Sequence, residues 1–181
     1  CLKEKYPERK ITVYDTRSIS IGSGMQIYYA ALMKQKGASD EEIIEFLKSF
    51  TPKVRTVFVV EDLKHLKRGG RISSTAATFG TLFNIKPLLH IPMTSGKVEP
   101  LAKAKGRKMA IKMLADYATQ NTDTSYRIMV THADCENDAD TLIEQIKEKL
   151  PDATVTKQFV GPVIGAHCGA DVLGISYINL D

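Results

Sequence analysis

Apolar positions along the chain follow two alternating patterns, one typical of helices and one typical of buried strands. Apolar residues spaced three or four apart, which give a helix one hydrophobic stripe, mark residues 43–50, 110–117 and 139–146. Short runs rich in apolar and β-branched residues, which suit buried strands, occupy residues 54–60, 127–131, 154–159 and 172–178. Helices alternating with strands predict an α/β fold, with a parallel sheet at least in its first portion.

The first forty residues carry further local signals. Residues 11–14 are a short β-prone run, which we interpret as a buried strand. A loop follows, and then a predicted helix over residues 25–36 that Gly37 stops. Ser39 and Glu42 have the spacing of a capping box, in which the serine accepts from the backbone at the glutamate and the glutamate reaches back. This spacing predicts the start of a second helix.

The pattern changes in the middle of the chain, after residue 61. Residues 63–66 predict a short helical piece that ends at Gly69 and Gly70. Ser73 is placed to cap a further helix that runs through Leu82. The chain then leaves the helix–strand alternation of its first part.

Two strands are predicted at residues 86–92 and 97–102, joined across a turn at residues 94–96 that suits a hairpin. Their prolines favour edges or bends over mid-sheet positions. We therefore predict two units. Residues 1–61 would belong to an incomplete N-terminal parallel α/β domain, and residues 62–181 would form a second α/β domain with a mixed or antiparallel sheet.

Composition and charge exclude several classes of protein. Of the 181 residues, 43% are hydrophobic and 25% are charged, near the globular average, which excludes a mainly disordered chain. The formal charge of +4, from 25 basic and 21 acidic residues, is too small to indicate a polyanionic partner by itself. No apolar run approaches the roughly 20 residues that span a bilayer, so an integral membrane protein is not expected.

The cysteines indicate a reducing compartment. Cys1, Cys135 and Cys168 are odd in number and widely spaced, and no two form a CxxC pair. This usage argues against a disulfide framework and against a cysteine zinc site. We therefore expect a cytoplasmic protein without a structural metal.

The sharpest candidate for chemistry is the run of residues 66–74, which contains Gly69, Gly70 and Arg71. The glycines let the backbone turn tightly and approach a ligand. Arg71 precedes a predicted helix N-terminus, where an anion is favoured, and arginine can bind a carboxylate with two parallel hydrogen bonds. The alternative is a glycine C-cap followed by a surface arginine, and the residues alone favour that alternative, because a short motif is weak evidence.

The same basic turn has a second interpretation, as part of a regulatory or nucleic-acid-binding module with a patch formed by Lys64, His65, Lys67, Arg68 and Arg71. The run lacks interleaved aromatic residues, and the chain shows no recognised nucleic-acid fold signature. A solvated basic turn is therefore the preferred interpretation, and no nucleic-acid partner is expected.

A second glycine-rich run spans residues 161–170 and contains His167 and Cys168. His167 could donate a hydrogen bond to an anion or act as an acid–base group, and the two residues together could indicate a thiol enzyme. The alternative is a tight turn with a partly buried histidine. Neighbours in sequence rarely point at each other as catalysis requires, and no orienting Asn or Asp is identifiable. We therefore interpret Cys168 as a small structural residue.

Three other features predict no site. His65, His90 and His132 lack metal-ligand spacing. The acidic residues between 134 and 140 lack the glycine and distal glutamate of an EF-hand and lie around a helix start, where acids are favoured. The apolar cluster between residues 79 and 91 is more often core than ligand tunnel.

Taken in order, several short segments resemble the DegV family. They are similar to that family's VxDS–S–GxG, L–L–GGRIS and L–IKPIL segments, its strand turn and K–R–K helix start, and its IGxHxG segment. The corresponding positions are residues 13–24, 63–73, 83–89, 96–98 with 105–108, and 164–169. Each motif is modest, but the ordered set covers essentially the whole chain and is specific.

Two departures from the family pattern bear on the site. The family usually continues its histidine motif with Gly-Pro-Gly, whereas this chain has Gly169, Ala170 and Asp171. Family members also begin with a segment containing a TS dipeptide and an SSGLSGT-like run, whose hydroxyls hold a fatty-acid carboxylate, and nothing here matches it. Because Cys1 is not a start methionine and a strand-like run follows almost at once, we expect a missing upstream segment of roughly a third of a full-length member.

The resemblance implies a bacterial protein that binds a long-chain fatty acid in a buried pocket. It implies a carrier, not an enzyme, that presents the fatty acid to a separate fatty-acid kinase, with no cofactor. Carried over by position, Arg71 and His167 would lie near the carboxylate. The glycines beside them and the apolar residues of the tunnel complete the expected ligand-binding set, which consists of Gly70, Phe83, Ile85, Ile164 and Gly165. An incomplete first domain would also expose apolar surface, which predicts self-association as a homodimer.

Overall fold

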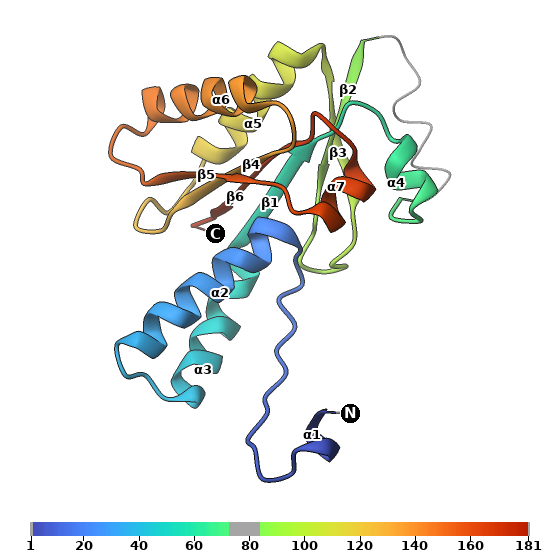
Figure 1. The fold of residues 1–181 in the computed structure, drawn as a ribbon. Coiled ribbons are helices and arrows are strands. Elements are labelled where there is room, and N and C mark those ends of the chain that lie inside the picture. Colours follow the sequence, from blue (N-terminus) through green and yellow to red (C-terminus); the bar gives the residue numbers. More distant parts are fainter. Residues whose placement is uncertain (1, 73–83, 181) are drawn as a thin grey trace.

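The computed structural model describes residues 2–72 and 84–180 and contains one mixed sheet with the strand order β3-β2-β1-β6-β4-β5 (Figure 1). The strands in chain order are β1 (Val54–Val59), β2 (Ile85–His90), β3 (Glu99–Lys105), β4 (Ile128–His132), β5 (Val155–Phe159) and β6 (Leu173–Ile178). Strands that are neighbours in the sheet are therefore often distant in sequence.

Helices precede and separate the strands. In chain order they are α1 (Leu2–Lys5), α2 (Ser20–Gln35), α3 (Asp40–Phe50), the 3-10 turn η1 (Thr51–Lys53), α4 (Lys64–Arg68), α5 (Arg107–Thr119), α6 (Glu136–Lys149) and α7 (Pro162–Cys168). The predicted capping box is present at the start of α3, where Ser39 accepts from the amide of Glu42 and Glu42 accepts from the amide of Ser39. In the described part of the chain, no helix is both long and apolar enough to cross a bilayer.

The centre of the sheet is the antiparallel pair of β1 and β6, which runs in register from Val54 opposite Ile178 to Val59 opposite Leu173. Nearly every side chain of both strands is buried. Since alternate residues of a strand point to opposite faces, both strands contribute to the core on both sides of the sheet.

The two faces carry different layers (Figure 1). On one face, α5 and α6 pack against Val57, Val59 and Ile175. On the other face, Phe58 and Val60 join a cluster with residues of α4 and α7. A third cluster on the same side as Phe58, formed around α2 and α3, includes Val54. Odd-numbered residues of β1 thus face the layer of α5 and α6, and even-numbered residues face the layer on the other side of the sheet.

The predicted hairpin and the predicted α/β class are confirmed. β2 and β3 pair antiparallel, and β3 with its Pro100 is a sheet edge. Pro87 lies in β2, which has neighbours on both sides, but β1 pairs with β2 only from Leu88 onward. The side of Pro87 that lacks an N–H therefore needs no partner.

Three expectations differ from the structure. Residues 11–14 form no strand, and the side chain of Val13 is 82% exposed. A β-prone run becomes a strand only when another strand pairs with it, and no described strand adjoins this run. The parallel pairing expected before residue 61 is also absent, because β1 is antiparallel to both neighbours and the parallel pair of the described chain is β4 with β5. The tight turn weighed as the alternative for residues 161–170 is not present either, because residues 162–168 form helix α7.

The sheet also crosses the predicted boundary between residues 61 and 62. β1 precedes that boundary, yet it pairs with β2 and β6, which follow it. The division into two domains stays a prediction. The helix expected from Ser73 to Leu82 lies outside the described residues.

Replacing a central residue of β6 should lower the free energy of unfolding far more than replacing the same residue type at the surface. Ile175 is fully buried at the core of the sheet, whereas Ile27 on α2 is 64% exposed. We expect Ile175→Ala to cost about 2–5 kcal/mol, from lost burial and the cavity left behind. Ile27→Ala should stay within about 0.5 kcal/mol of the parent. Chemical denaturation measures both, and equal losses would contradict this account of the core.

Candidate functional site

The glycine-rich turn after α4 has a specific backbone. Gly69 is the C-cap of the helix, and Gly70 has a φ of +67°, a left-handed conformation that glycine adopts without cost. The amide of Gly70 donates to the carbonyl of Lys67 at 3.0 Å, and the amide of Arg71 donates to that of Leu66 at 2.8 Å. These two bonds cap the C-terminus of α4 and hold the turn that carries Arg71.

Helices α4 and α7 interlock through two histidines and two glycines. A Cβ atom at Gly69 would overlap Nδ1 of His167, so the imidazole occupies the space that a side chain would need. In the reciprocal contact, a Cβ at Gly169 would lie 2.8 Å from Cδ2 of His65. The two predicted motifs, 100 residues apart in sequence, therefore meet in the fold.

Arg71 and His167 both lie against Gly69. The Nη1 atom of Arg71 donates to the carbonyl oxygen of Gly69 at 2.7 Å, and the arginine is exposed. His167 is half-buried, and its ring lies where a side chain of Gly69 would be. A guanidinium and an imidazole are thus held at one turn, which is an arrangement that can bind a carboxylate.

An apolar cavity of about 30 Å³ lies at the face of the sheet that carries α4 and α7. Its walls come from the central strands, from α7 and from the loops around them. The lining residues are Ile19, Ser20, Thr56, Phe58, Ile91, Thr131, Val160, Ile164, Cys168, Val172 and Gly174. Gly174 matters for the packing, because a Cβ there would lie 3.1 Å from Cβ of Phe58.

A larger cleft of about 640 Å³ adjoins the cavity. Gly70 and Arg71 line this cleft, together with residues of the β2–β3 connection. Ile19 and Ile91 line both hollows, so the cavity and the cleft are separated by these two side chains. The described part of the chain thus has a cleft bordered by the charged side chain of Arg71 beside a smaller apolar cavity.

The thiol of Cys168 faces this apolar interior and is 5% exposed. Burial raises the pKa of Cys168 to about 11, because the charged thiolate is poorly solvated there. The thiolate is the nucleophile in cysteine chemistry. At neutral pH only about one thiol in ten thousand would be ionised at such a pKa, which argues against a thiol enzyme at this position.

The residues expected to bind a ligand are distributed as follows. Arg71, Gly70 and His167 meet at the turn, and Ile164 lines the cavity. Gly165 lies on α7 between these residues, and a Cβ there would meet open space. Ile85 begins β2 and is half-buried but lines neither hollow.

Phe83 lies outside the described residues. Sequence reasoning missed Ile19, Phe58 and Val160 as cavity residues. Phe58 lies in a predicted buried strand and Val160 directly follows another, and no periodic signal separates a core side chain from one that borders a cavity.

Comparisons with known proteins agree on one family. The family model described as "Uncharacterised protein, DegV family" matches residues 1–180. A DegV domain-containing protein of Clostridium perfringens is 42% identical over 180 residues, which are 98% of this chain and 62% of that protein. The chain therefore spans about three fifths of the length of this relative.

Two solved structures extend the comparison to the fold. DegV of Bacillus subtilis, described as a fatty acid binding protein, is 33% identical with a TM-score of 0.79, over 94% of this chain and 61% of that one. The Streptococcus pneumoniae Fatty Acid Kinase (Fak) B3 protein, loaded with linoleic acid, is 24% identical with a TM-score of 0.87, over 99% of this chain and 63% of that one. The second likeness shows the fold alone.

The interlock of α4 and α7 can be tested by filling one of its glycines. We expect Gly69→Ala to lower the free energy of unfolding by about 1–3 kcal/mol, because the added methyl group displaces the imidazole of His167. The NMR signals of that ring should shift. Gly24→Ala is the matched control, because a Cβ there meets open space within α2. It should raise stability by about 0.5–1 kcal/mol. A neutral Gly69→Ala with an unmoved imidazole would contradict the interlock.

Proposed function

The chain belongs to the DegV family, and we propose on that premise that it binds a long-chain fatty acid and carries it to a partner fatty-acid kinase. Arg71 and His167 would hold the carboxylate at the turn after α4. The acyl chain would enter the apolar interior bordered by Ile164 and Phe58. The fatty acid is the only ligand that this proposal needs, and it requires no cofactor.

The observation that supports this proposal best is the adjacency of an apolar cavity and an exposed guanidinium. A fatty acid has two incompatible ends. Each buried CH₂ group gains about 0.8 kcal/mol, whereas its carboxylate can be buried only with charged or hydrogen-bonding partners. The cleft next to Arg71 and the apolar walls beyond Ile19 and Ile91 offer one environment to each end.

The cavity must widen to accept an acyl chain. Its volume of about 30 Å³ equals roughly the share of one molecule in liquid water, whereas ligand pockets usually measure about 300–1,000 Å³. Ile19 and Ile91 separate the cavity from the 640 Å³ cleft. We propose that these side chains move apart when a fatty acid enters and join the two hollows.

A carrier fits the chemistry of the site better than an enzyme does. The relative from Bacillus subtilis is described as a fatty acid binding protein. Burial raises the pKa of Cys168 and so disfavours the thiolate at neutral pH. A kinase partner is supported by the name of the Streptococcus pneumoniae protein that shares the fold, and such a partner places the carrier in the cytoplasm, where it meets ATP-dependent enzymes.

Removing the guanidinium should weaken fatty-acid binding. A hydrogen bond to a charged group contributes about 1.5–3 kcal/mol, so Arg71→Ala should raise the Kd by about 10- to 150-fold. Equilibrium titration with a fluorescent fatty acid measures the change. Lys67→Ala, which removes one positive charge from the same exposed turn, should change the Kd less than about twofold.

Two further variants separate the carrier from the enzyme. His167→Ala should weaken binding less than Arg71→Ala does, because an imidazole offers fewer hydrogen-bond donors than a guanidinium. Cys168→Ser should leave binding nearly unchanged. If Arg71→Ala binds as tightly as the parent while Cys168→Ser abolishes function, these residues have other roles and a thiol enzyme becomes the better reading.

A further inference from the structure

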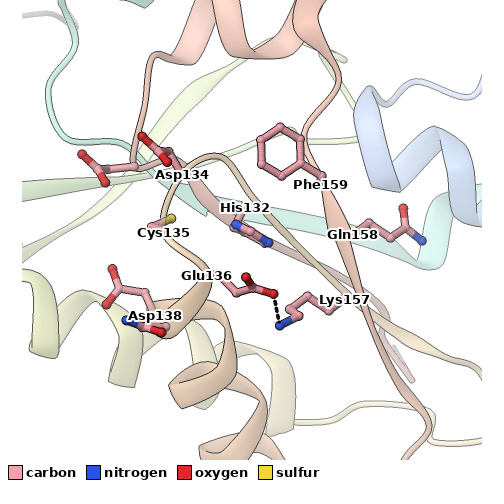
Figure 2. A pocket seen from close by; sticks show the side chains of 10 residues that line it. His132, Asp134, Cys135, Glu136, Asp138, Lys157, Gln158 and Phe159 are labelled. Atoms are coloured by element: carbon pink, nitrogen blue, oxygen red, sulfur yellow. Dashed lines mark hydrogen bonds and ion pairs between the residues drawn. The ribbon is translucent and has the colours of Figure 1, made fainter.

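A third hollow, of about 700 Å³, lies at the far end of the sheet from the β2–β3 hairpin and has no role in the proposed fatty-acid site (Figure 2). It is bordered by the ends of β4 and β5 and by the first turn of α6. Its lining residues are His132, Asp134, Cys135, Glu136, Asn137, Asp138, Lys157, Gln158, Phe159 and Asp171.

The topology of the sheet creates this hollow. β4 and β5 are parallel, so their carboxyl ends lie at the same edge. The chain leaves β4 into α6 on one face, and it leaves β5 into α7 on the other face. Ligands of open α/β sheets bind in the crevice where two such connections diverge. The hollow occupies this position.

The charges in the hollow are not balanced. The carboxylate of Glu136 is paired with Nζ of Lys157 at 2.7 Å (Figure 2). Asp138 is paired with Nε of Arg107, also at 2.7 Å. Asp134 and Asp171 line the same hollow, and neither has an ion pair within the described part of the chain. Lys157 also pairs with Asp140 at 2.7 Å. Acidic side chains therefore outnumber basic ones around the hollow, and Asp134 and Asp171 are left without a cationic partner in the described part of the chain.

The loops that carry Asp134 and Asp171 are joined by backbone hydrogen bonds. The amide of Asp171 donates to the carbonyl of Ala133 at 2.8 Å, and the amide of Ala133 donates to the carbonyl of Val172 at 3.0 Å. Both aspartates have left-handed backbones, with φ of +59° for Asp134 and +60° for Asp171. The loops that carry them are therefore fixed against each other at the rim.

His132, the last residue of β4, supplies an independent sign of a ligand. Its side chain is only 6% exposed, and its Nδ1 atom is buried without a hydrogen-bond partner among the described residues. The imidazole lies in the middle of the hollow's side chains, between Cys135, Phe159 and the Glu136–Lys157 pair (Figure 2). Buried polar nitrogens are usually satisfied, so this ring has an unused bond to offer.

Phe159 contributes an aromatic ring to the rim of the hollow. Its ring packs edge-on against the imidazole with centroids 5.4 Å apart, yet the side chain is 71% exposed at the rim. The face of an aromatic ring attracts cations. A cationic ligand is favoured by all three features: two carboxylates without ion pairs, an unpartnered imidazole and an exposed aromatic ring.

We propose that this hollow binds an organic cation, a guanidinium or a primary ammonium group. The carboxylates of Asp134 and Asp171 would take its charge, His132 would accept a hydrogen bond, and Phe159 would cover it. An anion is disfavoured although the N-terminus of α6 lies here, because Glu136 and Asp138 already occupy that first turn. This site is independent of the proposed fatty-acid function.

The cation could belong to a small molecule or to a basic side chain of another protein, and two probes separate these sources. Agmatine represents the small molecule, and the peptide acetyl-Gly-Arg-Gly-amide represents the side chain. Titration of the parent protein, followed by NMR shifts of the amides between β4 and α6, should show saturable binding of at least one probe. The peptide with citrulline in place of arginine, which has the same shape without the charge, should not bind.

The double variant Asp134→Asn with Asp171→Asn should weaken the bound probe at least tenfold. Asparagine tolerates a left-handed backbone as well as aspartate does, so the loops should keep their shape, and an unchanged unfolding temperature checks this. Asp152→Asn is the control, because Asp152 is exposed in the turn at the other end of α6. Failure of both probes, equal binding of the citrulline peptide, or an unaffected double variant would each overturn the proposal.

Discussion

The antiparallel pairing of β1 with β6 is the constraint on which the rest of the structure depends. Both strands are buried on both faces, and their register fixes which side chains enter each layer. Odd positions of β1 join the core under α5 and α6, and even positions join the layer under α4 and α7. A shift by one residue would move Phe58 from the cavity wall into the opposite core.

The candidate site follows from that arrangement and from one close packing contact. α4 and α7 come from distant parts of the chain, and they approach closely only because Gly69 and Gly169 leave space for two imidazoles. The same contact sets Arg71 at the mouth of the cleft and Ile164 at the wall of the cavity. Packing of the two helices and placement of Arg71 at the cleft are therefore one structural feature.

Local elements could be predicted from the sequence because their signals are local. The capping box at Ser39 and the hairpin between β2 and β3 depend on residues close together in the chain, and both are present. Residues 11–14 carry a strand pattern but lack a described partner strand, which no local pattern can reveal. The glycines before Cys168 gave no helical signal, yet these residues form helix α7. Pro162 begins it, since proline suits a first helical turn.

The candidate site could be predicted only in part, because part of it depends on long-range packing. The two motifs around Arg71 and His167 were visible in the sequence, but their meeting at Gly69 depends on the fold.

The central claim is that the apolar interior holds a fatty acid. The most direct test is to extract lipid from the purified protein and identify it by mass spectrometry. The account predicts a long-chain fatty acid at about one molecule per chain. A preparation free of lipid that also fails to take up added fatty acid would contradict it.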